Sequence, residues 1–202
     1  MEPSSDDRSA VEIQRLREAL NLAPEQVDIS ALVPIFVPGA FCALGNWPGP
    51  YSLLRAKDLG LTWSVVLPNQ TMRYVDRRLE EHWDSRGIQW KTLALKNLSD
   101  ITMKIGTHEF RREDGTIYAV AMMHADGIGP SRLLLRDRLA SLFPEGYKVA
   151  MPEMSCGLAH SNRISEPEMA KIQDTVNHCY KNGIRPLVPG IYSPEELFEA
   201  VR

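Results

Sequence analysis

One stretch, from Ile117 to Ser161, constrains the fold of this chain more than any other. It opens on the apolar run IYAVAMM, residues 117–123, which has the length of a strand and offers no polar face. Such a run predicts a central strand with both faces covered. The segment HADGIGPS, residues 124–131, follows it, and its two glycines, proline and aspartate predict a tight turn. We therefore expect this stretch to build the centre of a sheet.

The residues after the turn fit two structures. Ser131 can cap a helix that runs through Phe143, with leucines on one side. Alternatively, residues 131–135 form a strand and Asp137 caps a shorter helix. The segment Tyr147 to Met151 is a strand in either case, and Pro152 is expected to end it.

Apolar periodicity and capping residues predict the remaining elements. Strands are predicted at 31–37, 61–67, 72–75 and 104–112; helices are predicted from Asp6 or Asp7, at 76–83, 88–101 and 166–182, and from Ser193; a turn or short helix is predicted at 153–161. Pro34 makes the first of these strands either an edge strand or two extended pieces. The mixture predicts an α+β fold, with a mainly antiparallel or mixed sheet and helices packed on it.

Composition limits the class of protein. A chain of 202 residues with 44% hydrophobic residues can bury a core, and we expect one domain over 1–202 with a flexible tail at 1–6. A net charge of −3 gives no general attraction to nucleic acid. The absence of an 18-residue apolar run predicts no membrane span. Three widely spaced cysteines, Cys42, Cys156 and Cys179, suit reduced thiols and a cytoplasmic location.

Metal and cofactor motifs are missing from the sequence. The five histidines show no HxxxH or HExxH spacing, and Asp126 beside His124 is expected to form a turn with its own backbone. The GIGP segment at 127–130 lacks the remaining residues of a dinucleotide or P-loop fingerprint. We expect neither a metal nor a cofactor. The arginines of the central region are expected on a solvated ion-pair surface: Arg73, Arg77, Arg78, Arg111, Arg112, Arg132, Arg136 and Arg138.

A cysteine and a histidine form one candidate catalytic pair. Cys156 and His160 lie four residues apart, so they would meet across one turn of a helix. A nucleophilic cysteine needs a partner that lowers its pKa, and an imidazole can do so. The alternative is a small buried thiol in a packed turn.

The candidate binding residues lie in two places. Segment 37–52 contains three prolines, three glycines and the aromatic residues Phe41, Trp47 and Tyr51, which either present a binding surface or fold back onto the core. Asn97 falls on the apolar face of the helix predicted at 88–101. It either contacts a ligand or ties the helix to a neighbouring segment, because an unpaired buried amide costs about 1–3 kcal/mol.

The order of elements resembles a known family. The segments LTWSVVLPNQTMRYV, LALKNL, IYAVAMMHADGIGPSRLLL and GYKVAMPEM are similar to those of the YtpQ-like family of uncharacterised bacterial proteins. The resemblance covers residues 61–198, and it favours the strand over the helix for residues 131–135. It implies no activity and no catalytic residue.

Two functions follow as hypotheses. The first is a non-enzymatic module that binds a protein or a small ligand, through Phe41, Trp47, Tyr51 or Asn97. The alternative is a cysteine-dependent hydrolase or transferase that uses Cys156 and His160. The identity of the partner and the oligomeric state are open.

Overall fold

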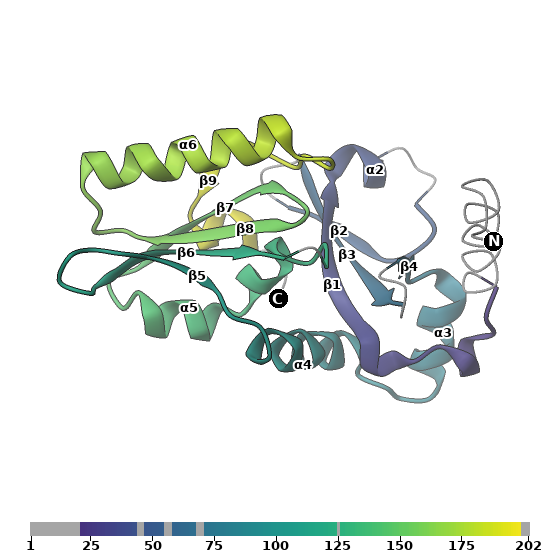
Figure 1. Ribbon diagram of the computed structural model, residues 1–202. Coiled ribbons are helices and arrows are strands. Elements are labelled where there is room, and N and C mark those ends of the chain that lie inside the picture. The colour runs from purple at the N-terminus through teal and green to yellow at the C-terminus, as the bar shows by residue number, and fades with distance from the viewer. Residues whose placement is uncertain (1–20, 44–46, 55–57, 68–70, 125, 199–202) are drawn as a thin grey trace, which may run out of the picture.

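The computed structural model describes residues 21–43, 47–54, 58–67, 71–124 and 126–198. The helix predicted from Asp6 or Asp7 and the tail at 1–6 lie outside these residues. The described part has the predicted α+β fold, but its strands divide into two antiparallel sheets rather than one (Figure 1). None of the described helices has the length and apolar character needed to cross a membrane.

The first sheet is built from the N-terminal half of the chain. In the described residues its strands are β1 (Leu32–Pro38), β2 (Tyr51–Leu53), β3 (Leu59–Val66) and β4 (Met72–Tyr74). They run in the order β1-β3-β2, and β4 also pairs with β3, antiparallel to it. Pro34 of β1 lies opposite Trp63 of β3. β1 is therefore an edge strand, one of the two predicted possibilities, and Pro34 does not interrupt it.

The second sheet contains the stretch that dominates the sequence. Its described strands are β5 (His108–Arg111), β6 (Ile117–Met123), β7 (Tyr147–Glu153), β8 (Cys156–Ser161) and β9 (Ile191–Tyr192), in the order β5-β6-β8-β7-β9. The central position of β6, between β5 and β8, confirms that prediction. Pro152 does not end β7, which runs on to Glu153 with a change of register.

The prediction of a turn or short helix over residues 153–161 is wrong. Residues Met154 and Ser155 form the turn of a hairpin, and Cys156–Ser161 is the strand β8. All six residues of β8 are buried, because the strand lies between β6 and β7 and is covered on its faces. This burial comes from tertiary packing, which overrides the weak strand preference of the sequence CGLAHS.

Helices surround the two sheets. They are α2 (Gly39–Ala43), α3 (Arg77–Ser85), α4 (Trp90–Met103), α5 (Arg136–Leu142), α6 (Glu166–Asn182) and α7 (Pro194–Phe198), with the 3₁₀ helices η1 (Pro24–Gln26), η2 (Ile29–Ala31) and η3 (Pro130–Leu134). Asp76 and Ser193 cap their helices as predicted, whereas Asp137 lies inside α5 and does not cap it. Asp76 accepts a hydrogen bond from the Leu79 amide at 3.0 Å, and Ser165 and Ser193 open capping boxes.

Residues 130–135 differ from both predicted structures. Residues Pro130–Leu134 form the 3₁₀ helix η3, and Leu135, with φ −78° and ψ 63°, separates it from α5. The strand that the family resemblance favoured is therefore wrong, and so is the uninterrupted helix capped by Ser131. The physical reason is the position of η3, which contacts β1 of the first sheet, β7 and β8 of the second, and α4.

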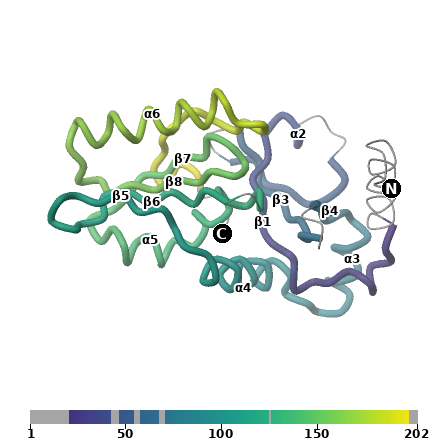
Figure 2. The backbone as a smooth tube through the Cα atoms, in the orientation of Figure 1, coloured from purple at the N-terminus to yellow at the C-terminus, as the bar shows by residue number. Residues whose placement is uncertain are grey.

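The core runs through both sheets. A single cluster of buried side chains includes Leu32 from β1, Leu98 from α4, Leu133 from η3 and Val149 from β7. Figure 2 shows α4 on one side of the molecule, near the place where the two sheets meet. α4 is therefore anchored to the junction of the two sheets.

Asn97 ties α4 to the start of the first sheet. The side chain is buried, and its Nδ2 donates to the carbonyl oxygens of Ile29 and Leu32, each at 3.0 Å. Both amide hydrogens are therefore used within the protein. Of the two roles predicted for Asn97, this geometry supports the structural one.

Replacing Asn97 by leucine should lower the free energy of unfolding by about 1–3 kcal/mol, because two buried carbonyl oxygens lose their donor. Urea denaturation monitored by circular dichroism measures this change. The control is Lys96→Ala on the same helix, which removes an exposed pair with Asp100 and should cost at most about 0.5 kcal/mol. Equal losses in the two variants would contradict the anchoring role of Asn97.

Candidate functional site

The structure separates the two residues of the candidate catalytic pair. Cys156 is the first residue of β8 and His160 the fifth, so they pair with opposite ends of β6, at Met123 and Ala119. Four residues of an extended strand span about 13 Å. The helical turn that would have brought the thiol and the imidazole together is absent from this segment.

The surroundings of each group keep it uncharged. Burial raises the pKa of the Cys156 thiol, and the neighbouring Cys179 and Glu153 raise it further. Burial lowers the pKa of His160, whose Nδ1 donates to the Ser161 carbonyl oxygen at 2.8 Å. Cys156 is thus a protonated thiol at neutral pH, which is a weak nucleophile.

The aromatic residues of segment 37–52 are only partly packed. Phe41, on α2, is 53% exposed and Tyr51, on β2, is 43% exposed. Trp47 is half-buried and meets Tyr74 edge-on, with 4.9 Å between ring centroids. Trp47 therefore folds back towards the core, whereas Phe41 and Tyr51 remain available at the surface.

The turn after β6 is closed by an ion pair. Asp126 Oδ1 accepts a hydrogen bond from the Ile128 amide at 3.1 Å, the turn predicted from the sequence. Its two oxygens also accept from the guanidinium of Arg132, at 3.1 and 2.6 Å. Arg132 is buried, so its predicted place on a solvated surface is wrong.

The pKa of the Asp126 carboxyl reflects this environment. Burial acts to raise it, but the hydrogen bond from Arg132, the Ile128 amide and the Arg132 charge together lower it. The carboxylate is therefore ionised at neutral pH and holds Arg132 in place. Because Arg132 belongs to η3, the pair fixes the position of the residues that follow it, Leu134 and Leu135.

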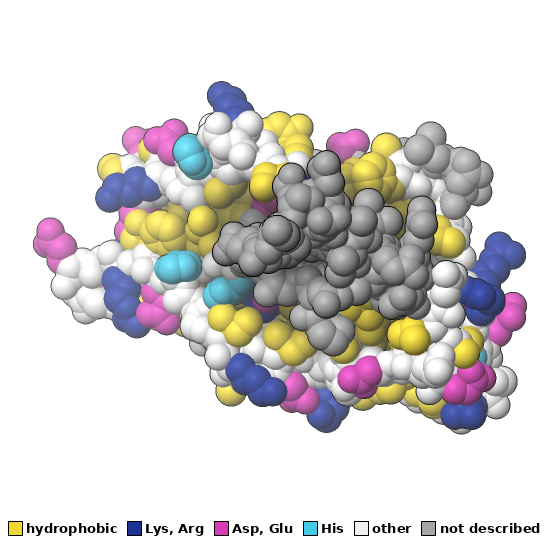
Figure 3. Space-filling view, turned by 45° about the vertical axis from the view of Figure 1, so that its right-hand side comes forward, with side chains coloured by type: hydrophobic (Ala, Val, Ile, Leu, Met, Phe, Trp, Pro, Cys, Tyr) yellow, Lys and Arg dark blue, Asp and Glu magenta, His cyan; other side chains and the backbone are white. Residues whose placement is uncertain are grey.

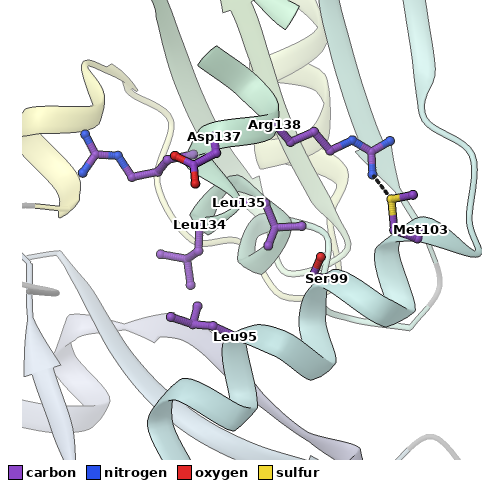
Figure 4. Close-up of a pocket in the computed structure, with 8 residues that line it drawn as sticks. Leu95, Ser99, Met103, Leu134, Leu135, Asp137 and Arg138 are labelled. Atoms are coloured by element: carbon purple, nitrogen blue, oxygen red, sulfur yellow. Dashed lines mark hydrogen bonds between the residues drawn. The ribbon is translucent and has the colours of Figure 1, made fainter. Parts of the chain in front are cut away.

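An apolar groove lies between α4 and the segment formed by η3 and α5 (Figure 4). Its volume is about 710 Å³. Its lining residues are Leu95, Ser99, Met103, Leu134, Leu135, Arg136, Asp137 and Arg138. Four of these side chains are apolar, and the charged ones come from the start of α5.

The α4 side of the groove is a stripe at helical spacing. Leu95, Ser99 and Met103 follow one another at four-residue intervals, so they lie along one face of α4. Leu95 is 39% exposed and Met103 is 74% exposed. Leu95 and Leu134 point towards each other across the groove in Figure 4. The groove is therefore an apolar surface open to solvent.

The sequence contained part of the evidence for this groove. Leu95 and Met103 are apolar residues that lie off the predicted core face of their helix, which Ala94 and Leu98 represent. An exposed apolar stripe could have been inferred from them. Leu134 and Leu135 could not have been placed opposite, because their position depends on the 3₁₀ helix and the buried Arg132.

The other arginines follow the predicted pattern more closely. Arg78 pairs with Asp76, Arg111 with Glu109, and Arg112 with Glu168. Figure 3 shows positive and negative side chains interspersed around the edges of one face. Arg73 is an exception: it is buried like Arg132 and donates to the Leu22 carbonyl oxygen at 3.1 Å, so its predicted place on a solvated surface is also wrong.

No protein-family model, curated protein or solved structure matches this chain. The resemblance to the YtpQ-like family therefore stays a prediction. Within the part of the chain that the structure describes, no group of three or more histidine, cysteine, aspartate or glutamate side chains is placed to hold a metal ion.

Iodoacetamide should modify Cys179 faster than Cys156 or Cys42 at pH 7.5. Cys179 is partly exposed, whereas the other two are buried and burial raises the pKa of each thiol. Mass spectrometry of timed digests measures the three rates, and labelling in urea, where all three should react alike, is the control. Preferential labelling of native Cys156 would instead support the cysteine-dependent enzyme.

Replacing Asp126 by asparagine should destabilise the fold at pH 7 and much less at acid pH. The pKa of Asp126 is lower in the folded protein, so its contribution is present above the unfolded value of about 3.9 and is lost as pH falls through the folded value. We expect a loss of about 1–3 kcal/mol at pH 7, less than for a fully buried pair because Asp126 is partly exposed.

Urea denaturation of wild type and Asp126→Asn at pH 7 and pH 2.5 measures this effect. The exposed Asp100→Asn variant, which loses only its pair with Lys96, should differ little from wild type at either pH. A difference between wild type and Asp126→Asn that is unchanged at pH 2.5 would refute the ion pair as its source.

Proposed function

We propose that this protein is a non-enzymatic, protein-binding module whose α4–α5 groove receives an apolar segment of a partner. One observation carries the proposal: Leu95 and Met103 are exposed beside Leu134 and Leu135, although the same helix has a separate, buried face. Contiguous exposed apolar surface marks interaction sites in folded proteins.

The shape of the groove favours a peptide segment over a small molecule. Sites for small ligands enclose most of the ligand surface, whereas this groove is bounded by a methionine that is 74% exposed. The distance along α4 from Leu95 to Met103 is about 12 Å, or roughly two helical turns. A two-turn apolar stripe matches the anchors of a helix that binds in a groove.

The two walls of the groove are held before any partner arrives. Asn97 anchors α4 from its buried face, and the Asp126–Arg132 pair fixes η3. A preorganised surface loses little conformational entropy on binding. Met103 adds adaptability, because its unbranched side chain adjusts to different partners.

The proposal leaves a place for two earlier hypotheses. The exposed Phe41 and Tyr51 support a second contact surface on the first sheet. The proposed YtpQ-like region, residues 61–198, contains every residue that lines the groove, so this family would be expected to share it. Direct use of Cys156 as a nucleophile has no comparable support from the geometry around it.

Selection of a phage-displayed library of random 16-residue peptides tests the groove. Enriched peptides should carry apolar residues at helical spacing, and their affinity should fall at least about tenfold for Leu95→Asp and Met103→Asp, the loss expected of an apolar anchor. Ile184→Asp is the matched control, because Ile184 is 94% exposed and does not line the groove. Fluorescence anisotropy measures each affinity.

Melting temperatures should be nearly equal in the three variants, because each replaced side chain is exposed. The absence of enriched peptides would overturn the proposal. Peptides that bind Leu95→Asp, Met103→Asp and Ile184→Asp equally well would overturn it too.

A further inference from the structure

The groove contains a guanidinium that lacks a carboxylate partner. Arg138 is exposed on α5, and its Nη1 approaches the Met103 sulfur at 3.9 Å (Figure 4). Among the residues that the structure describes, the Arg138 side chain makes this one weak hydrogen bond and forms no ion pair. The positive charge therefore remains available beside apolar surface.

Two carboxylates near Arg138, those of Asp137 and Glu109, do not pair with it. In Figure 4 the Asp137 carboxylate lies away from the Arg138 guanidinium, although the two residues are adjacent. Glu109 lines a neighbouring pocket together with Arg138 but pairs with Arg111. Among the described residues, no carboxylate is paired with Arg138 and would compete with an incoming one.

Arg138 also forms the wall between the groove and that second pocket. The second pocket has a volume of about 260 Å³, and the buried side chains of Val120 and Met122 lie beneath it. A carboxylate that reaches Arg138 from the groove therefore has the apolar side chains of the groove on one side and the mixed polar and apolar lining of this pocket on the other. Charge-assisted hydrogen bonds gain strength where water is excluded, and a guanidinium can bind a carboxylate through two of them.

We infer that the partner segment is an amphipathic helix with a glutamate or aspartate beside its apolar anchors, and that Arg138 binds this carboxylate. The inference rests on the proposed function, since it specifies the partner of the same groove. The apolar stripe runs from Leu95 to Met103, and Arg138 lies at the Met103 end. The carboxylate that binds Arg138 consequently belongs at the end of the partner's apolar stripe that lies beside Met103.

The charge acts locally rather than through the field of the whole protein. The chain has a net charge of −3, so long-range attraction would not draw an acidic partner. Arg138 instead discriminates at short range, because an acidic segment gains an ion pair and a basic one meets a like charge. Complementary charges of this kind contribute more to specificity and register than to affinity.

Two synthetic 16-residue helices test the inference. Both carry leucines at positions i, i+4 and i+7. They differ at a single position, one helical turn after the last leucine, which is glutamate in one peptide and lysine in the other. Wild type should bind the glutamate peptide about tenfold more tightly, as expected for one favourable charge-assisted contact. Arg138→Glu should reverse the preference, and Arg138→Lys should keep it in weakened form, because lysine retains the charge without the planar fork.

Arg163→Glu is the matched control, because it makes the same change of charge at an exposed arginine that does not line the groove. It should leave the preference for the glutamate peptide unchanged. Raising the salt concentration from about 50 to 500 mM should reduce the preference of wild type, as screening predicts. Fluorescence anisotropy gives each affinity, and melting curves confirm that the variants fold.

The outcomes separate the two proposals. If both peptides bind wild type and Arg138→Glu equally, but lose affinity for Leu95→Asp, the groove binds helices and Arg138 does not select their charge. If neither peptide binds wild type, the proposed function itself fails. An equal loss of preference in Arg163→Glu and Arg138→Glu would show that net charge, not Arg138, is responsible.

Discussion

The ion pair between Asp126 and Arg132 lies where the two sheets meet. A buried guanidinium is costly to desolvate, and the two hydrogen bonds from Asp126 offset that cost only while the turn after β6 keeps its shape. Arg132 lies in η3, which contacts β1 on one side and β7 and β8 on the other. The position of Arg132 is thereby coupled to both sheets. Leu134 and Leu135, which follow it and line the groove, are held in place by the same contacts.

The glycines around this turn serve close packing. A Cβ atom at Gly129 would collide with the carbonyl oxygens of Met122 and Ser155, and one at Gly157 would meet the backbone of Gly129. Gly127 has a φ of 71°, which favours glycine. Backbone from the turn and from β8 therefore approaches more closely than side chains would permit, which explains these glycines without a bound phosphate.

Periodic elements with clear caps could be predicted from the sequence, and elements that depend on distant contacts could not. β6 follows from an apolar run and α6 from apolar residues at helical spacing, both of which are local patterns. β8 is a strand because it is enclosed by β6 and β7, and its sequence, CGLAHS, contains no alternation that would indicate this. The predicted proximity of Cys156 and His160 depended on a local helical turn, so it failed for the same reason that β8 was missed.

The α4 side of the candidate site could have been predicted from the sequence, because α4 has two apolar faces. One face, with Ala94 and Leu98, is buried in the core, and folding alone accounts for it. The other, with Leu95 and Met103, is only partly covered in the fold, with exposed fractions of 39% and 74%, and burying the remaining apolar surface is worth roughly 25 cal/mol per Å². In the proposed function, a partner that covers the groove gains that free energy, and the second face of α4 then acts in association rather than in folding.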